Sequence, residues 1–119
     1  MSKINIHTIL QTQEETYEYN VSAIYKEDEE IIIYKENDEQ NTKTTYNYKT
    51  KELIRENDSL KMCYLFNKSK NTIGKIYVKE LTRTFDLIIT TRKILRCGQN
   101  IEIDFLVEEQ AFNYKIEVK

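Results

Sequence analysis

The sequence contains no proline, only two glycines, two cysteines and a single histidine among its 119 residues. A chain without proline and nearly without glycine has no flexible linker of the usual compositions, and two isolated glycines cannot form a phosphate-binding loop. Cys63 and Cys97 are too few for a disulfide framework, so we expect both thiols to be reduced. The length and these absences indicate one compact domain, residues 1–119, with no cofactor.

Long apolar runs and blocks of like charge are also missing. No run approaches the ~20 residues of a membrane-spanning helix, and 18 basic residues alternate with 20 acidic ones to give a net charge of −2. We therefore expect neither a nucleic-acid-binding arm nor a membrane-surface segment. The first residues lead directly into a strand-like segment rather than a signal peptide, so the predicted location is the cytoplasm.

What the sequence does contain is a regular alternation of apolar and polar residues. Successive side chains of a strand point to opposite faces, so each alternating set should lie on one face of a strand. No stretch keeps helical periodicity over the ~11 residues needed to predict a helix. Short segments rich in asparagine, aspartate and charged residues separate the sets and supply turns without proline. The clearest sets are Ile4–Leu10, Tyr17–Tyr25, Leu60–Phe66, Leu81–Ile89, Ile101–Val107 and Phe112–Val118.

The number and spacing of these sets predict a barrel. Roughly ten strands joined by short connections favour antiparallel neighbours. Such a meander closes into a barrel or forms a sandwich, and consecutive hairpins without a long crossover favour the barrel. The run Leu81–Leu95 has no turn signal, so we expect a long strand that bends around the barrel. The predicted fold class is all-β, a single antiparallel up-and-down β-barrel of about 8–10 strands.

Four segments, YEYNVSAIYKEDEEIIIYKE, ELIREND, YLFNKSKNT and FDLIITTRKI, resemble the YwiB-like family of small bacterial proteins. The resemblance spans Ile4 to Val118 and consists mostly of strand patterning. The family has a Thr/Ser-Pro-aromatic-Gly turn before a strand that ends in Thr-x-x-apolar. Thr91–Ile94 matches that ending, whereas Glu80–Arg83 lacks the aromatic residue and the glycine of the turn. The resemblance implies a calycin-like barrel, of the lipocalin or streptavidin type, with no established activity.

No arrangement of residues points to catalysis or metal binding. His7 is expected to face solvent, and none of the four serines lies in a nucleophile elbow, so no Ser-His-Asp triad is predicted. One histidine and two distant cysteines do not have the spacing of a zinc site. Asp86 and Asp104 lie among apolar residues, and we expect each to pair with a lysine or arginine on a neighbouring strand. We predict no enzyme activity, no catalytic residue and no metal site.

Tyrosine is the most informative residue type. By strand parity, eight of the nine tyrosines face the barrel interior, and only Tyr77 does not. One interpretation is a filled core whose hydroxyls reach the barrel mouths or Thr42, Thr44 and Thr91, because a buried hydroxyl needs a partner. The other is a cavity, since a barrel of about eight strands can hold one small ligand. The candidate ligand-binding residues are Tyr19, Tyr25, Tyr34, Tyr46, Tyr48, Met62 and Tyr64.

Two functions remain open. The favoured one is non-enzymatic binding of a small, largely apolar ligand inside the barrel. The alternative is a protein-interaction module or homodimer that uses the outer barrel face, because exposed apolar clusters are uncommon on monomers. Binding of single-stranded nucleic acid needs a basic groove, which a chain with a pI near 5.5 does not predict. The apolar residues that fall off the core parity are Ile9, Ile24, Ile31, Ile33, Ile88 and Leu106.

Overall fold

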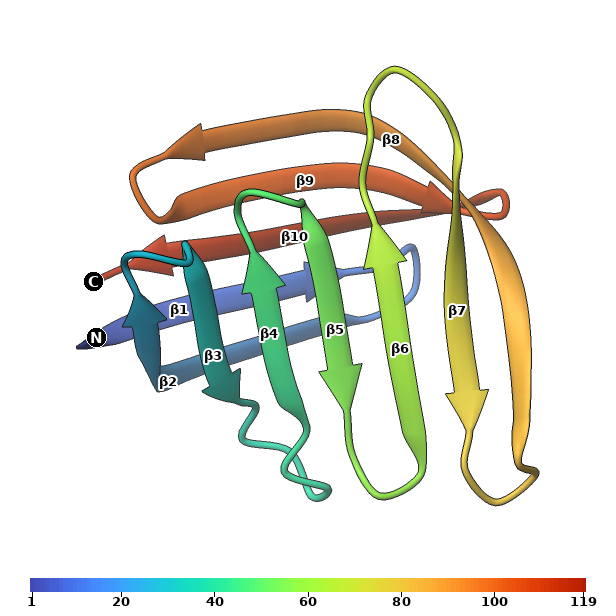
Figure 1. The fold of residues 1–119 in the computed structure, drawn as a ribbon, viewed down its shortest axis with the longest axis horizontal. Helices are drawn as coiled ribbons and strands as arrows, with labels where there is room; N and C mark the ends of the chain where they lie inside the picture. Colours follow the sequence, from blue (N-terminus) through green and yellow to red (C-terminus); the bar gives the residue numbers. More distant parts are fainter.

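The computed structural model describes residues 1–119 as ten strands without a helix. They form one closed antiparallel barrel in the order β1-β10-β9-β8-β7-β6-β5-β4-β3-β2 (Figure 1). This arrangement confirms the predicted all-β class and the up-and-down barrel. No helix long and apolar enough to cross a bilayer is present. The strands are β1 (Ser2–Gln11), β2 (Thr16–Lys26), β3 (Ile31–Lys35), β4 (Lys43–Asn47), β5 (Glu52–Glu56), β6 (Leu60–Leu65), β7 (Thr72–Val78), β8 (Arg83–Cys97), β9 (Asn100–Val107) and β10 (Gln110–Val118).

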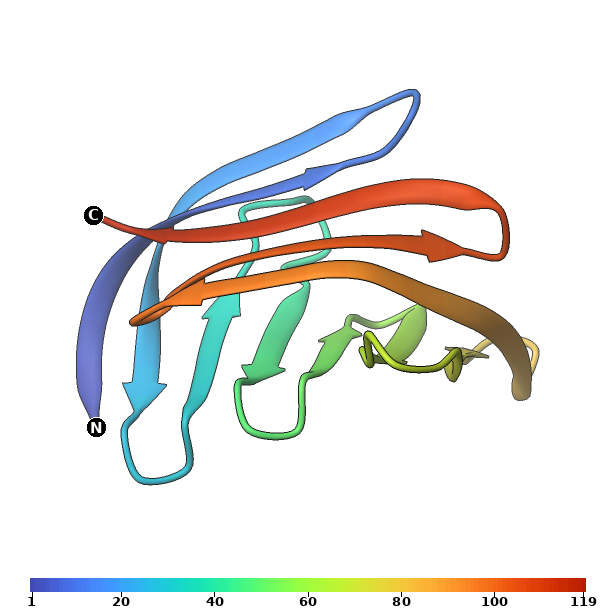
Figure 2. The same ribbon diagram turned by 90° about the horizontal axis from the view of Figure 1, so that it is seen from above.

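The barrel is flattened into two layers whose strands cross. Strands β3 to β7 run side by side in one layer, whereas β9, β10 and much of β1 and β2 lie in the other (Figures 1 and 2). β8 has 15 residues and belongs to both layers. It pairs with β7 through Arg83–Ile89 and with β9 through Ile89–Cys97. The predicted long strand that bends around the barrel is therefore confirmed, although it runs from Arg83 to Cys97 and not from Leu81 to Leu95.

A β-bulge lies in the second half of β8. The pairing with β9 shifts between Thr91 and Lys93, so that Arg92 is an extra residue on β8. A bulge bends its strand, and one additional residue reverses the alternation of side chains. Ile89 and Thr91 are buried before the bulge, and Ile94 lies opposite the buried Ile103 after it. The bulge therefore places Ile94 on the inner face, where continued alternation would have placed Lys93.

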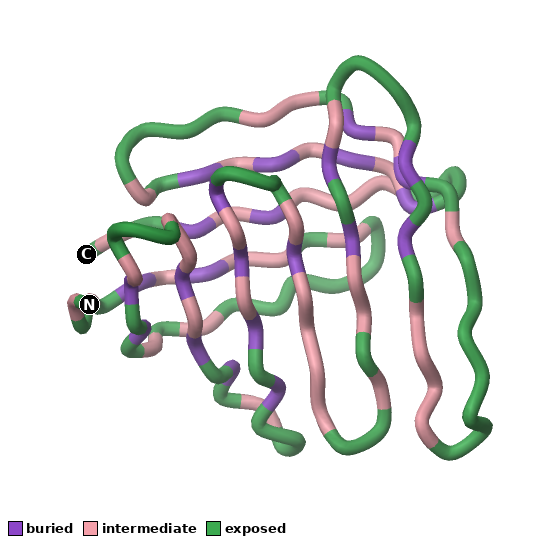
Figure 3. The backbone as a smooth tube through the Cα atoms, viewed as in Figure 1, coloured by how far each residue is buried: buried purple, intermediate pink, exposed green.

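The core lies between the layers, and every strand contributes to it. Figure 3 shows the buried positions within the strands and the exposed ones in the turns and along the first part of β8. Aromatic rings pack at close range, with centroids 4.7 Å apart for Phe66 and Phe105 and 4.9 Å apart for Tyr46 and Tyr48. The buried hydrophobic residues are Ile6, Ala23, Tyr25, Ile32, Tyr34, Tyr46, Tyr48, Leu53, Tyr64, Phe66, Ile89, Ile101, Ile103, Phe105, Val107, Tyr114 and Ile116.

Three residues that the alternation assigned to the core face are exposed. Leu81 lies in the turn between β7 and β8, where Thr82 has a positive φ of 50°. Tyr17 and Phe85 are 41% and 40% exposed near the beginnings of β2 and β8. Alternation indicates which face a side chain occupies but not how exposed it is. Tyr17 lies where β2 has no β3 beside it, and Phe85 precedes the part of β8 that pairs with β9. The expectation that these three side chains belong to the core was therefore wrong.

Expectations for individual polar residues can also be compared with the structure. Asp86 pairs with Lys75 of β7 at 3.0 Å, and Asp104 pairs with Arg92 of β8 at 2.9 Å. Both cross-strand ion pairs are therefore confirmed. The two cysteines are free thiols. His7 lies on the outer face, opposite the buried Ile6 and Thr8, as expected; it is partly buried there, and its Nε2 lies 2.5 Å from Glu18 Oε1.

Gly74 allows a test of the packing between β7 and the core. An ideal Cβ at this position would lie 2.9 Å from Tyr64 Cδ1 and 3.0 Å from Ile89 Cδ1. Gly74→Ala should therefore lower the free energy of unfolding by about 1–3 kcal/mol, measured by urea denaturation. Gly98→Asn is the control, because Gly98 has open space and a φ of 62° that asparagine tolerates. Equal urea midpoints for Gly74→Ala and the unsubstituted protein would contradict this packing.

Candidate functional site

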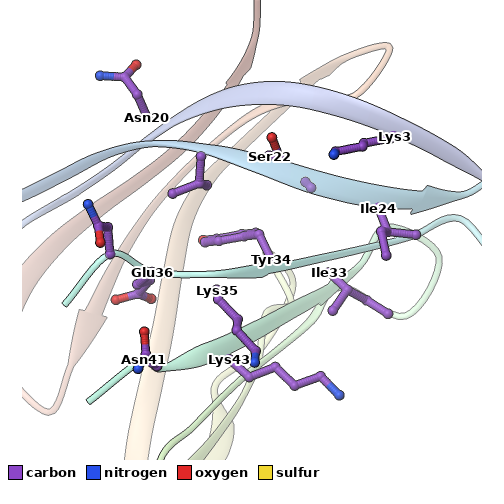
Figure 4. Close-up of a pocket in the computed structure, with 13 residues that line it drawn as sticks. Lys3, Asn20, Ser22, Ile24, Ile33, Tyr34, Lys35, Glu36, Asn41 and Lys43 are labelled. Carbon is purple, nitrogen blue, oxygen red and sulfur yellow. The ribbon is translucent and has the colours of Figure 1, made fainter. Parts of the chain in front are cut away.

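The barrel wall is open along the first half of β2. β2 pairs with β3 through only four residue pairs, from Ala23–Tyr34 to Lys26–Ile31. The segment Thr16–Ser22 pairs with β1 alone, so the other backbone edge of this segment has no strand beside it. Beyond Tyr34, the chain leads through Glu36 into the loop before β4 (Figure 4). A gap between the two strands results.

A hollow of about 670 Å³ lies at this gap, and we call it the lateral groove. Its apolar wall comes from both faces of the sheet: Val21, Ala23 and Tyr34 from the inner face, and Ile24 and Ile33 from the outer face. Figure 4 shows Tyr34 between the diverging strands, with charged and amide side chains around it. A volume of this size and a mainly apolar wall are typical of small-molecule sites, which span roughly 300–1,000 Å³.

A buried ion pair forms the inner end of the groove. Glu36, which is 5% exposed, accepts hydrogen bonds from Arg55 Nε at 2.8 Å and from an Arg55 terminal nitrogen at 2.7 Å. Thr44 Oγ1 donates a further hydrogen bond to Glu36 at 2.7 Å. Burial by itself would lower the pKa of Arg55, but the hydrogen bonds and the charge of Glu36 raise it. Arg55 therefore stays cationic and balances Glu36, as a buried charge requires.

Three buried tyrosine hydroxyls have partners far away along the chain. Those of Tyr34 on β3 and Tyr114 on β10 hydrogen-bond each other in the interior. At another position, the Tyr48 hydroxyl donates to the Gln99 carbonyl at 2.8 Å. Burial raises the pKa of Tyr34, Tyr48 and Tyr114 above the usual range and that of Tyr46 to about 12. These hydroxyls are therefore neutral donors and acceptors at neutral pH.

The interior behind the groove leaves little room. A cavity lined by Tyr19, Tyr34, Glu36, Arg55 and Tyr114, together with residues of β1, has a volume of about 10 Å³. That volume accommodates about one water molecule. A ligand larger than water would therefore need the groove, or a rearrangement of these side chains.

The seven residues predicted from the sequence as a ligand site fall into separate groups. Tyr25, Tyr46 and Tyr48 pack on one another in the core, with centroids 6.0 Å apart for Tyr25 and Tyr48. Tyr34 lines the lateral groove, and Tyr19 lines the small cavity behind it. The other two lie further along the barrel: Tyr64 borders a separate hollow of about 580 Å³ beside Leu87 and Phe112, and Met62 is partly buried. Their role in ligand binding stays a prediction.

The sequence reasoning missed most of the groove. Its lysines and outer isoleucines line the same hollow as the inward-facing Tyr34 because β2 and β3 separate after four residue pairs, which opens the wall between the two faces of the sheet. One signal was available, because the alternating run Tyr17–Tyr25 is much longer than the β-rich run Ile31–Tyr34 that follows it. A long strand beside a short one must keep part of its edge unpaired. No group of three or more histidine, cysteine, aspartate or glutamate residues could hold a metal ion.

Comparison with known structures supports the fold. The crystal structure of ywiB protein from Bacillus subtilis matches this barrel with a TM-score of 0.66 over 96% of this chain and 87% of that chain. The two sequences are 15% identical, so the likeness shows a shared fold and not a shared activity. No protein-family model and no curated protein matches the chain. The resemblance inferred from the sequence is therefore confirmed at the level of the barrel fold.

The raised tyrosine pKa values predict a loss of stability at high pH. An unfolded tyrosine ionises near pH ~10, whereas Tyr46 in the folded protein has a pKa of about 12. The stability gained by keeping buried hydroxyls protonated is fully present below pH ~10 and is lost as the pH rises through the folded values. Absorbance at 295 nm should show incomplete ionisation of the nine tyrosines until the dichroism of the fold is lost. Complete ionisation near pH ~10 with a native spectrum would contradict this burial.

Proposed function

We propose that this protein is a non-enzymatic binding protein that takes a small, largely apolar ligand into the lateral groove. The observation that carries the proposal is the hollow of about 670 Å³ where β2 leaves β3. Moving apolar ligand surface from water onto Val21, Ala23 and Ile33 would drive binding, at roughly 25 cal/mol per Å² buried. The unpaired edge of Thr16–Ser22 offers backbone donors and acceptors that a ligand could use.

The groove suits this role better than the centre of the barrel. The centre holds the packed rings of Tyr25, Tyr46 and Tyr48, and a ligand there would have to displace them. In the groove, the ligand would lie against the ring of Tyr34 while the Glu36–Arg55 pair behind it stays intact. Binding there leaves the core packing unchanged, so the stability of the barrel and its affinity for a ligand do not compete.

A fluorescence titration with phenylnaphthylamine, a neutral apolar probe, tests the proposal. We expect saturable one-to-one binding that Ile33→Gln weakens several-fold, because a polar amide then replaces part of the apolar wall. Ile54→Gln is the matched control, since Ile54 lies two strands away on the same outer face and does not line the groove. Tyr46→Phe, a change within the filled core, should also leave binding unaltered. Absence of saturable binding, or equal losses in Ile33→Gln and Ile54→Gln, would reject the groove as the site.

A row of apolar side chains on the outer face favours a second candidate function, self-association. Strand register aligns Ile24, Ile33, Thr45, Ile54 and Cys63 across β2 to β6, and we call this the outer row. Ile24 is 41% exposed, and the other members of the row are partly buried. A stripe interrupted only by Thr45 is more significant than scattered apolar residues.

The charges beside the outer row suit a second copy of this chain. One flanking row carries Lys35, Lys43, Glu56 and Lys61, and the other contains Lys26 and Glu52. Both signs are therefore present on one face, which lets a two-fold axis bring opposite charges together. The other predicted outward residues are separate from this row: Ile9, Ile31 and Leu106 are partly buried, and Ile88 pairs with Ile73 elsewhere on the surface.

Sedimentation equilibrium tests self-association. If the outer row forms a dimer, the mass should rise with concentration from 14.3 kDa toward twice that value. Ile54→Lys should abolish the rise by placing a charge in the middle of the row. Ile73→Lys is the control, because Ile73 is exposed and lies outside the row. A single species of monomer mass at high concentration, or equal effects of both substitutions, would exclude this interface.

A further inference from the structure

Two lysines face each other at the rim of the lateral groove. Lys35 on β3 and Lys43 on β4 are direct cross-strand partners, and both line the groove together with Lys3 of β1 (Figure 4). Like charges directly opposite each other destabilise a sheet. The pair is therefore unfavourable in the ligand-free protein, and it lies beside a hollow that could hold a compensating charge.

The carboxylates near these lysines are already occupied. None of the three lysines takes part in an ion pair. Glu36 lines the same groove, but Arg55 binds both of its carboxylate oxygens. Glu56 lies opposite Lys43 on β5, but its ion pair, at 3.0 Å, is with Lys79; Lys79 is the main cause of the lowered pKa of Glu56, and the charge of Lys43 contributes less. The rim of the groove is thus positively charged, although the whole chain has a net charge of −2.

We propose that the ligand of the lateral groove is a free amphipathic anion, with an apolar body and one carboxylate, sulfonate or phosphate group. This inference rests on the proposed binding function and adds the chemistry of the ligand. The anionic group binds at Lys35 and Lys43, where charge-assisted hydrogen bonds are stronger than neutral ones. The apolar body lies on Val21, Ile24 and Ile33, the apolar lining side chains that keep exposed surface. Binding also relieves the repulsion between the two lysines.

The polar lining of the groove favours a free molecule over an anionic lipid held in a bilayer. Asn20, Ser22 and Asn41 lie beside the apolar wall, whereas a surface that enters a bilayer is apolar. The groove also opens between two strands rather than on a raised apolar surface. A lipid headgroup and a free amphiphile share the anionic chemistry, so the experiment must separate these two sources.

Two probes with the same ring system test the charge requirement. Anilinonaphthalene sulfonate carries one negative charge, whereas phenylnaphthylamine is neutral. At low salt the sulfonate should bind one-to-one and at least about tenfold more tightly, because its contacts to the lysines are charge-assisted. The difference should shrink as salt screens the exposed lysines. Free dodecanoate should displace the sulfonate, and vesicles of phosphatidylglycerol and phosphatidylcholine should not sediment the protein.

Lysine substitutions test whether the tighter binding of the anionic probe arises from the lysines at the rim of the groove. Lys35→Gln and Lys43→Gln should each reduce sulfonate affinity toward that of the neutral probe and leave the neutral probe unaffected. Lys61→Gln is the matched control, because Lys61 also lies opposite Glu56 on the outer face but does not line the groove. Lys35→Gln should also raise the urea midpoint of the ligand-free protein, since it removes the repulsion with Lys43.

The outcomes separate this inference from the proposed function. If both probes bind one-to-one with equal affinity, the anion requirement is overturned while binding of an apolar ligand stands. If neither probe binds, both proposals fail. If the sulfonate is preferred but Lys61→Gln weakens it as much as Lys35→Gln does, the lysine assignment is overturned. If the protein sediments with anionic vesicles and dodecanoate does not displace the sulfonate probe, the proposal that the ligand is a free molecule is overturned.

Discussion

The short pairing between β2 and β3 is the constraint on which the rest of the structure depends. β3 has five residues beside the eleven of β2, so four residue pairs close the barrel at this point. Ala23 and Tyr34 form the last of these pairs, and both are buried on the inner face. Beyond them β2 has one unpaired backbone edge, and the lateral groove opens there. A longer β3 would close the wall and remove the groove.

The polar cluster at this end of β3 joins the two layers where the wall is open. Glu36 follows β3 directly and is bound by Arg55 from β5 and Thr44 from β4. The hydroxyls of Tyr34 and Tyr114 connect β3 with β10 in the opposite layer. A buried ion pair adds little net stability, but loss of either partner is costly. The cluster therefore serves mainly to fix the position of the inner end of the groove.

Local patterning accounts for how much of the fold could be predicted. Alternation placed Tyr25, Tyr34, Tyr46 and Tyr48 on the inner face because the side-chain period of a strand is two wherever the strand lies. The same rule gave the correct face for Phe85 but not its exposure, because the exposure depends on how far the opposite layer extends. For the candidate site, Tyr34 was predicted to line it, whereas its lysines and outer isoleucines were not.

The sequence by itself determined the all-β class, the antiparallel connections and the side chains that face inward, because each follows from residues close together in the chain. The tertiary structure alone decided where β2 leaves β3 and where the bulge reverses the alternation of β8. It also brought Lys3 to the same groove as Lys35 and Lys43. Register and barrel closure depend on pairing between distant segments, and alternation within one segment carries no information about where that pairing stops.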